Sequence, residues 1–183
     1  MIQLAELLVI AVSVALVLAV VVLVRRAARL IADTRDTERF KRRVADLSAR
    51  VDQSLDGVAG RIDAVRRHTT GAEDIGENIA AAREAVARYE TEARALHGPA
   101  GANEIRDAIV GELGRAARAL EMADHGCEIL SSARIGSREL EAQTSIKRGY
   151  LNVLHAREAI ARHAARSTAL GKRETGGLFE RRA

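Results

Sequence analysis

The feature that most constrains this chain of 183 residues is an apolar run near its N-terminus, LLVIAVSVALVLAVVVLV, from Leu7 to Val24. Ser13 is the only polar side chain in the run, and its hydroxyl can bond to a carbonyl of its own helix. As a helix rising about 1.5 Å per residue, the run covers roughly 27 Å, close to the hydrocarbon thickness of a bilayer. The run therefore predicts a transmembrane helix over residues 7–24.

Two other interpretations of the run are weaker. A secretory signal begins with basic residues, has a shorter apolar core of about 7–15 residues and ends at a small-residue cleavage site. Here no Lys or Arg precedes the run, and Arg25 and Arg26 follow it directly. A buried core helix would have to be apolar on all sides, which is unusual in a chain of this size. An uncleaved span is the interpretation that fits best.

The basic residues beside the run predict its orientation. Residues 25–43 contain eight basic and three acidic side chains, whereas residues 1–6 contain no Lys or Arg. Basic residues flanking a span favour the cytoplasmic side. We therefore expect residues 1–6 to be a short extracytoplasmic N-terminus, residues 25–43 to be a basic juxtamembrane helix segment, and the rest to be cytoplasmic. Contact with anionic lipids is expected from Arg25, Arg26 and Arg29.

Composition favours an all-α fold after the span. Aromatic residues make up 2% of the chain, Trp is absent and there is one Pro. The second half is rich in Ala, Arg, Glu and Leu, which is the composition of long helices. Cys127 is the only cysteine, so an internal disulfide and a multi-cysteine metal site are both excluded.

Apolar residues after the span recur at the three- and four-residue steps of a coiled coil. This stripe allows the membrane helix to continue into the cytoplasm, and it consists of Phe40, Val44, Leu47, Val51, Leu55, Val58, Ile62 and Val65. Similar stripes predict two further helices, the first over Ile75–Leu96 and the second over Ile105–Leu130. A last helix is expected to use Leu140, Ile146, Tyr150, Val153 or Leu154, Ile160 and Ala164.

Turn and cap residues separate these helices. Thr70 and Glu73 have capping-box spacing, Asn103 is suited to cap the next helix, and Gly136-Ser137 fits a stop followed by a cap. The sequence thus predicts a transmembrane helix that continues into a coiled-coil or antiparallel bundle of about four helices over residues 44–170. A flexible tail is expected over residues 171–183. Whether the bundle closes within one chain or between chains stays open.

Two sets of residues are candidates for contacts. Ala11, Ala15 and Ala19 lie four apart on one face of the predicted span, a spacing that lets membrane helices associate. The stretch TSIKRGYLN offers Lys147, Arg148 and Tyr150 to an acidic partner, a phosphate or a lipid head. The alternative for this second stretch is a helix kink where a glycine admits a neighbouring backbone.

Catalytic, cofactor and metal sites are not expected. No phosphate-binding loop, dinucleotide fingerprint or nucleophile elbow is present, and the five histidines do not form a zinc motif. Basic charge is divided between the membrane flank and the last helix, and aromatic residues for base stacking are scarce, so nucleic-acid binding is not expected either.

These observations favour a non-enzymatic, single-pass membrane scaffold or tether. Its expected partners are membrane lipids, further copies of itself and an unidentified protein. Two alternatives are a signalling relay or accessory subunit of a membrane complex, and an envelope protein whose bundle lies outside the cell. The basic flank argues against the last of these.

Overall fold

The computed structural model describes the backbone of residues 2–99, 101–132 and 138–170. It describes the side chains of the same residues except those of 2–15 and 27–32. Every element in these ranges is a helix, and the elements are α1 (Ile2–Arg66), the short 3₁₀ helix η1 (Ala72–Asp74), α2 (Gly76–Arg94), α3 (Ala102–Ser131) and α4 (Glu139–Ser167). The all-α prediction is therefore confirmed for the described residues, whereas the predicted tail, 171–183, lies outside them.

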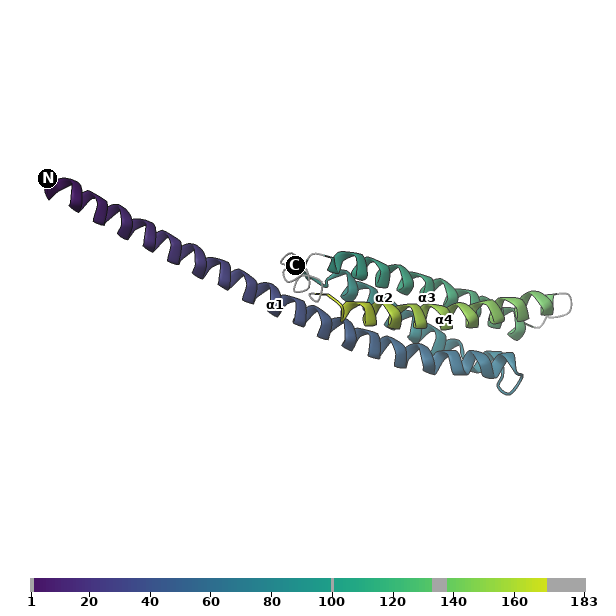
Figure 1. The fold of residues 1–183 in the computed structure, drawn as a ribbon. Helices are drawn as coiled ribbons and strands as arrows, with labels where there is room; N and C mark the ends of the chain where they lie inside the picture. The colour runs from purple at the N-terminus through teal and green to yellow at the C-terminus, as the bar shows by residue number, and fades with distance from the viewer. Residues whose placement is uncertain (1, 100, 133–137, 171–183) are drawn as a thin grey trace, which may run out of the picture.

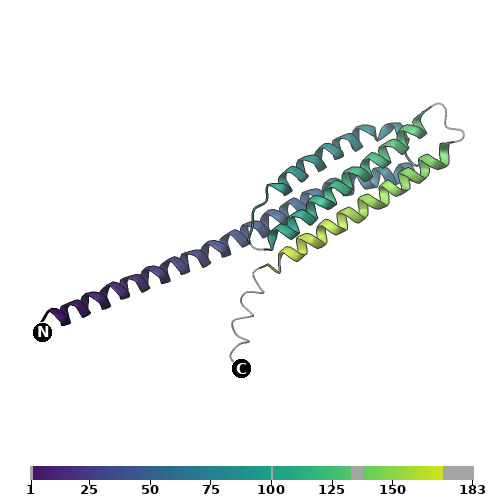
Figure 2. The ribbon, with the colours of Figure 1, turned by 90° about the horizontal axis from the view of Figure 1, so that it is seen from above.

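The four α-helices form an antiparallel bundle from which one end of α1 projects (Figure 1). The first half of α1 extends alone, and its second half packs with α2, α3 and α4, as the view from above also shows (Figure 2). Each helix contacts the next one along the chain, and α4 returns to contact α1, so the ring closes within one chain. The predicted helical bundle is thus present, and a second chain is not required to complete it.

The core is built from the apolar stripes. On α1 the stripe residues are between 0% and 4% exposed, from Phe40, at 1%, to Val65, at 3%. Most residues of the stripes on α2 and α3 are buried as well, and the largest fully buried side chains on these two helices are Ile79, Ile109, Leu113 and Leu120. Burial of large aliphatic side chains at this spacing supplies the main driving force for packing the helices.

α3 and α4 approach each other most closely, and two glycines permit this. A Cβ atom built on Gly149 would lie 2.7 Å from the carbonyl oxygen of Ala119 and 2.8 Å from the backbone nitrogen of Ala123. A Cβ atom on Gly126 would lie 2.8 Å from the carbonyl oxygen of Ala142. The backbones of the two helices are therefore in contact at these points. Gly149 thus admits a neighbouring backbone, as the second interpretation of TSIKRGYLN expects, while α4 continues through it as one α-helix.

The prediction for the core face of α4 was wrong in part. Leu140 is 77% exposed and does not join the core. Small residues are buried together with Ile146 on the face toward α3, and these small residues are Ala142, Gly149 and Ala156. Ile146, Val153 and Ile160 are buried as predicted.

The predicted caps also differ from those observed. Thr70 and Glu73 do not form a capping box, because the chain makes the 3₁₀ helix η1 there and α2 begins only at Gly76. α3 begins one residue before Asn103, and its N-cap is Gly101, with a φ of 85° that favours glycine. The predicted stop and cap at Gly136-Ser137 lie outside the described residues.

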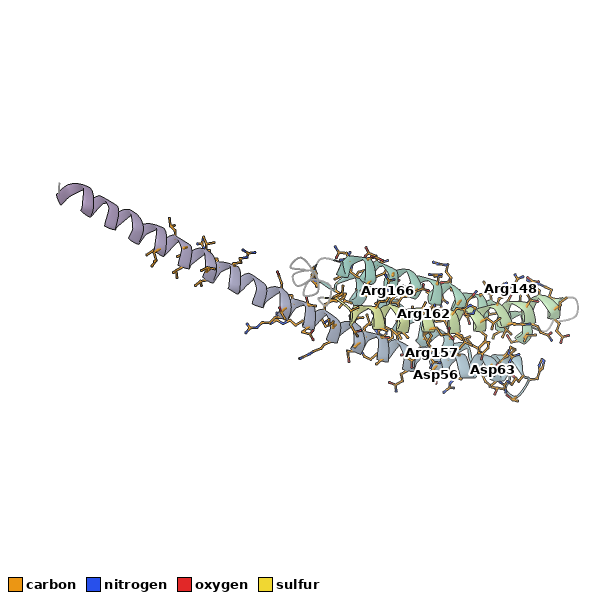
Figure 3. All side chains as sticks on the ribbon, viewed as in Figure 1. Asp56, Asp63, Arg148, Arg157, Arg162 and Arg166 are labelled. Carbon is orange, nitrogen blue, oxygen red and sulfur yellow. The ribbon has the colours of Figure 1, made fainter. Side chains whose placement is uncertain are left out.

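Arginines join all four neighbouring helix pairs around the bundle. These inter-helix ion pairs are Arg50–Glu92 between α1 and α2, Arg83–Glu121 between α2 and α3, Arg166–Glu104 between α3 and α4, and Arg157 with Asp52 and Asp56 between α4 and α1. Figure 3 shows Arg157 of α4 next to Asp56 of α1. Because Arg157 binds two carboxylates of α1, it links α4 to the helix whose first half projects from the bundle.

Candidate functional site

The projecting part of α1 carries an unbroken series of exposed apolar side chains. From Leu16 to Val24 every large side chain is between 40% and 66% exposed. Because these residues are consecutive, they cover all sides of the helix, which no other described helix touches here (Figure 1). Arg25 and Arg26, which follow at once, are exposed as well. An exposed apolar surface of this kind is stable only in contact with other apolar material.

Within the part of the chain that the structure describes, no helix carries an apolar stretch long enough to cross a membrane. Residues 7–15 of the predicted span lie outside the side chains that are described. The same holds for Ala11, Ala15 and Arg29, whereas Ala19 is described and exposed.

The opposite end of the bundle contains the residues of TSIKRGYLN. Tyr150 is half-buried, and the guanidinium of Arg66, at the end of α1, lies over its ring at 5.5 Å from the ring centre. Lys147 and Arg148 are exposed, and neither forms an ion pair with another described residue. Figure 3 shows Arg148 near the end of the bundle where α1 ends. The fold thus brings Lys147 and Tyr150 close to Arg66, while Arg148 is not part of this group.

Two adjoining pockets lie at this end, which we call the far end because it is opposite the projecting half of α1. The smaller, of about 160 Å³, has an apolar floor of Val65, Leu130 and Ile146 and polar walls formed by Arg66, His68, Gln143 and Lys147. The larger, of about 360 Å³, is lined by the connection after α1, from His68 to Glu73, together with Val65 and Leu130. Val65, His68 and Leu130 line both pockets, so the two form one concave surface.

His68 occupies a left-handed backbone conformation with a φ of 60°. It ends α1, since its N–H donates to the carbonyl of Val65 and the N–H of Thr69 donates to that of Ala64. This is the helix-ending arrangement in which glycine is usual, because a side chain there costs about 1–2 kcal/mol. The chain therefore places an imidazole between the two pockets at a cost in stability.

A groove of about 380 Å³ runs between α3 and α4, with both polar and apolar residues in its lining. It is lined by three arginines, Arg115, Arg118 and Arg162, together with His155 and Asn152. Glu112 is only 5% exposed and is paired with Arg115. Sequence reasoning missed this groove, because its residues come from two helices whose relative rotation no single stripe specifies.

Cys127 is buried at the interface of the helices. Burial is the main reason that the pKa of its thiol rises to about 11 from an ordinary value of 9.0, and the charges of Asp124 and Glu128 add to it. The thiol is therefore protonated at neutral pH, and a protonated thiol is a poor nucleophile. In the described ranges no group of three or more His, Cys, Asp or Glu side chains is placed to hold a metal ion.

Comparisons of the chain with protein-family models, with curated proteins and with solved structures find no match. Any function proposed for it therefore rests on its own residues and their arrangement.

Proposed function

We propose that this chain is a single-pass membrane-anchored helical scaffold that holds a protein partner at a fixed distance from the membrane. The observation that carries the proposal is the exposed apolar segment Leu16–Val24, which continues the apolar run that begins at Leu7. Burying large apolar side chains in hydrocarbon yields about 25 cal/mol per Å² removed from water. A bilayer is the environment that surrounds such a helix on all sides.

Continuity of α1 supports the scaffold part of the proposal. α1 runs without a break from the apolar segment into the bundle, and between them it carries pairs of opposite charge three residues apart, such as Asp36 with Arg39 and Glu38 with Lys41. Such pairs stabilise a solvent-exposed helix by a few tenths of a kcal/mol each. A bundle fixed to a helix of this kind is held away from the surface from which the helix emerges.

Self-association is proposed through the face of the span that bears Ala11, Ala15 and Ala19. The apolar stripe of α1 is already buried within one chain, so it is not free to pair with a second copy. Small residues in a membrane helix, by contrast, allow close approach of another span. An oligomer would then contain complete bundles joined only through their membrane helices.

Membrane fractionation tests the anchoring. We expect the full chain to stay with the membrane pellet after an alkaline carbonate wash and to be released by detergent. Replacing Val17 and Val21 together by Arg should move the chain to the soluble fraction, because an Arg near the middle of a span costs about 2.5–3.5 kcal/mol on insertion. The matched control is L151R, which changes an exposed leucine of the bundle. A wild-type chain found in the wash would refute the proposal.

Cysteine labelling tests the orientation. The variant C127A with a new cysteine in place of Ala183 carries one accessible thiol, which a membrane-impermeant maleimide reaches only from its own side. We expect no labelling in intact cells and full labelling once the membrane is opened, as the basic flank predicts. Labelling of intact cells would place the bundle outside and favour an envelope protein instead.

A further inference from the structure

We propose that the two adjoining pockets at the far end form a docking site for an acidic peptide segment of a partner protein, with one apolar side chain of that segment inserted between its carboxylates. The inference rests on the proposed function in one respect, namely that the scaffold holds a protein partner. It goes further in that it assigns the place, the residues and the chemistry of the contact.

The smaller pocket has the size and lining for one apolar side chain. Its volume of about 160 Å³ is close to that of a cavity that holds a molecule such as benzene, about 150 Å³. Val65 and Ile146 at its floor are 3% and 1% exposed and belong to the rigid core. The pocket is too small for a drug-sized ligand, which occupies about 300–1,000 Å³, but it fits the anchor residue of a peptide.

The walls of this pocket select for negative charge. Lys147 provides an ammonium group, while Gln143 Nε2 donates to Glu139 and the Arg66 guanidinium donates to Asp63. No acidic side chain lines the smaller pocket, whereas Glu73 lines the larger one, so the preference for negative charge belongs to the smaller pocket. Arg66 donates a hydrogen bond to Asp63 and thereby lowers the pKa of that carboxyl group. The guanidinium of Arg66 also packs over the ring of Tyr150. Lys147 has no acidic partner among the described residues and is free to bind a carboxylate of the peptide.

The larger pocket gives the peptide a path across the end of the bundle. It is continuous with the smaller one through His68, whose strained backbone directs an imidazole to the boundary between them. Residues with a strained backbone conformation are frequent at sites where a side chain binds a ligand. A peptide whose apolar residue enters the smaller pocket can therefore continue along the Thr69–Ala72 connection.

The position of the far end favours a protein over a lipid as the occupant. Val65 lies about 60 Å along α1 from Val24, where the apolar segment ends. Headgroups at the surface from which α1 emerges are then beyond reach of Lys147. The free end of a membrane-held rod is also the part that a protein partner approaches with least hindrance.

The test uses the full chain purified in detergent and fluorescence anisotropy with labelled octapeptides. The panel holds one apolar residue (Val, Leu, Ile, Met or Phe) flanked by glutamates, and the control peptides replace the apolar residue by Ser or the glutamates by Lys. We expect at least one acidic apolar peptide to bind with a Kd below about 100 μM, corresponding to roughly −5.5 kcal/mol. Both control peptides should bind at least tenfold more weakly.

Three variants separate this site from general attraction of charge. K147E should weaken binding at least tenfold by repelling the carboxylates, and Q143W should do the same by covering the smaller pocket without a change of charge. R148E alters the net charge as much as K147E does but lies outside the pocket, so it should leave Kd within twofold. All three positions are exposed, and circular dichroism checks that each variant is folded.

Several outcomes would overturn the proposal: no peptide of the panel binding with a Kd below about 100 μM, an equal loss in K147E and R148E, or equal binding of the peptide with Ser. Competition of phosphatidylserine vesicles with the bound peptide would point to a lipid ligand at this end and would also refute it. Fractionation of the same chain with membranes is a separate measurement, so failure of the docking site and failure of the anchoring are distinguishable.

Discussion

Adding one methyl group at Gly149 tests whether α3 and α4 are in backbone contact. In an ordinary helix, replacing Gly by Ala stabilises by about 1 kcal/mol, because Ala loses less conformational freedom on folding. At Gly149 the new Cβ would lie 2.7 Å from the carbonyl oxygen of Ala119 and 2.8 Å from the Cβ of Ala123. Non-bonded carbon atoms are normally about 3.5–4.0 Å apart, so α4 must move away from α3 by close to 1 Å.

The magnitude follows from two opposing effects. Overpacking of a close interface costs about 1–3 kcal/mol, and a gap of 0.5–1 Å also forfeits a quarter to a half of the dispersion energy of the separated contacts. Both losses fall on the α3–α4 interface around Gly149, where Ala119, Ala123 and Val153 are buried. After the gain of about 1 kcal/mol from helix propensity is subtracted, G149A should destabilise the bundle by up to about 2 kcal/mol.

The assay is thermal unfolding of the full chain in detergent, followed by circular dichroism at a helix wavelength. For a chain of this size 1 kcal/mol corresponds to about 2–4 °C, so G149A should lower Tm by up to roughly 8 °C. The matched control is G57A, since a Cβ atom there meets no other atom within 4 Å and Gly57 also lies within a helix. G57A should raise Tm by about 1–4 °C. A G149A variant that is stabilised as much as G57A would refute backbone contact between the helices.

Three further variants test other contacts. H68G should stabilise the bundle by about 1 kcal/mol, measured as a higher Tm, because glycine adopts the left-handed conformation without strain. The pKa of Cys127 is about 11 in the folded chain and 9.0 ordinarily, so the unfolded chain loses this proton first as pH rises. The free energy of unfolding, and with it Tm, should therefore fall between about pH 9 and pH 11. The fall in Tm that is due to Cys127 should be absent from C127S. R157A should cost about 1 kcal/mol by freeing α4 from Asp52 and Asp56, whereas R88A, whose ion pair is exposed, should change Tm little.

How much of the fold can be predicted from the sequence depends on the size of the buried side chains. Large aliphatic residues at steps of three and four define the core faces of α1, α2 and α3, because burial of such residues dominates their packing. On α4 the face toward α3 is made of Ala142, Gly149 and Ala156, and small residues give a weak signal in an apolar pattern. Leu140 gives a strong signal and is nevertheless exposed, because it lies two residues, about 200° around the helix, from the buried Ala142.

The candidate site could be predicted only in part, for a geometric reason. TSIKRGYLN stands out in the sequence because it combines basic residues, a glycine and a tyrosine, and Lys147 does line a pocket. Gln143, which precedes this stretch directly, lines the pocket too. The remaining walls come from residues that are distant in sequence, namely Val65, Arg66, His68 and Leu130. Their proximity depends on where α1 ends and on the rotation of α4 against α1, and neither is encoded in the stripe of one helix.

The antiparallel order of the bundle explains why the far end is suited to a partner. With four helices, the chain returns after α4 to the end at which α1 enters, so the far end carries the end of α1, the described connection that follows it, the end of α3 and the start of α4 (Figure 2). Turns of this kind tolerate polar and strained residues, such as His68, because they are not constrained by the packing of a helix face. The core beneath them, which includes Val65 and Ile146, is buried. In the proposed scaffold the anchor and the docking surface would lie at opposite ends, so a partner bound at one would not obstruct the other.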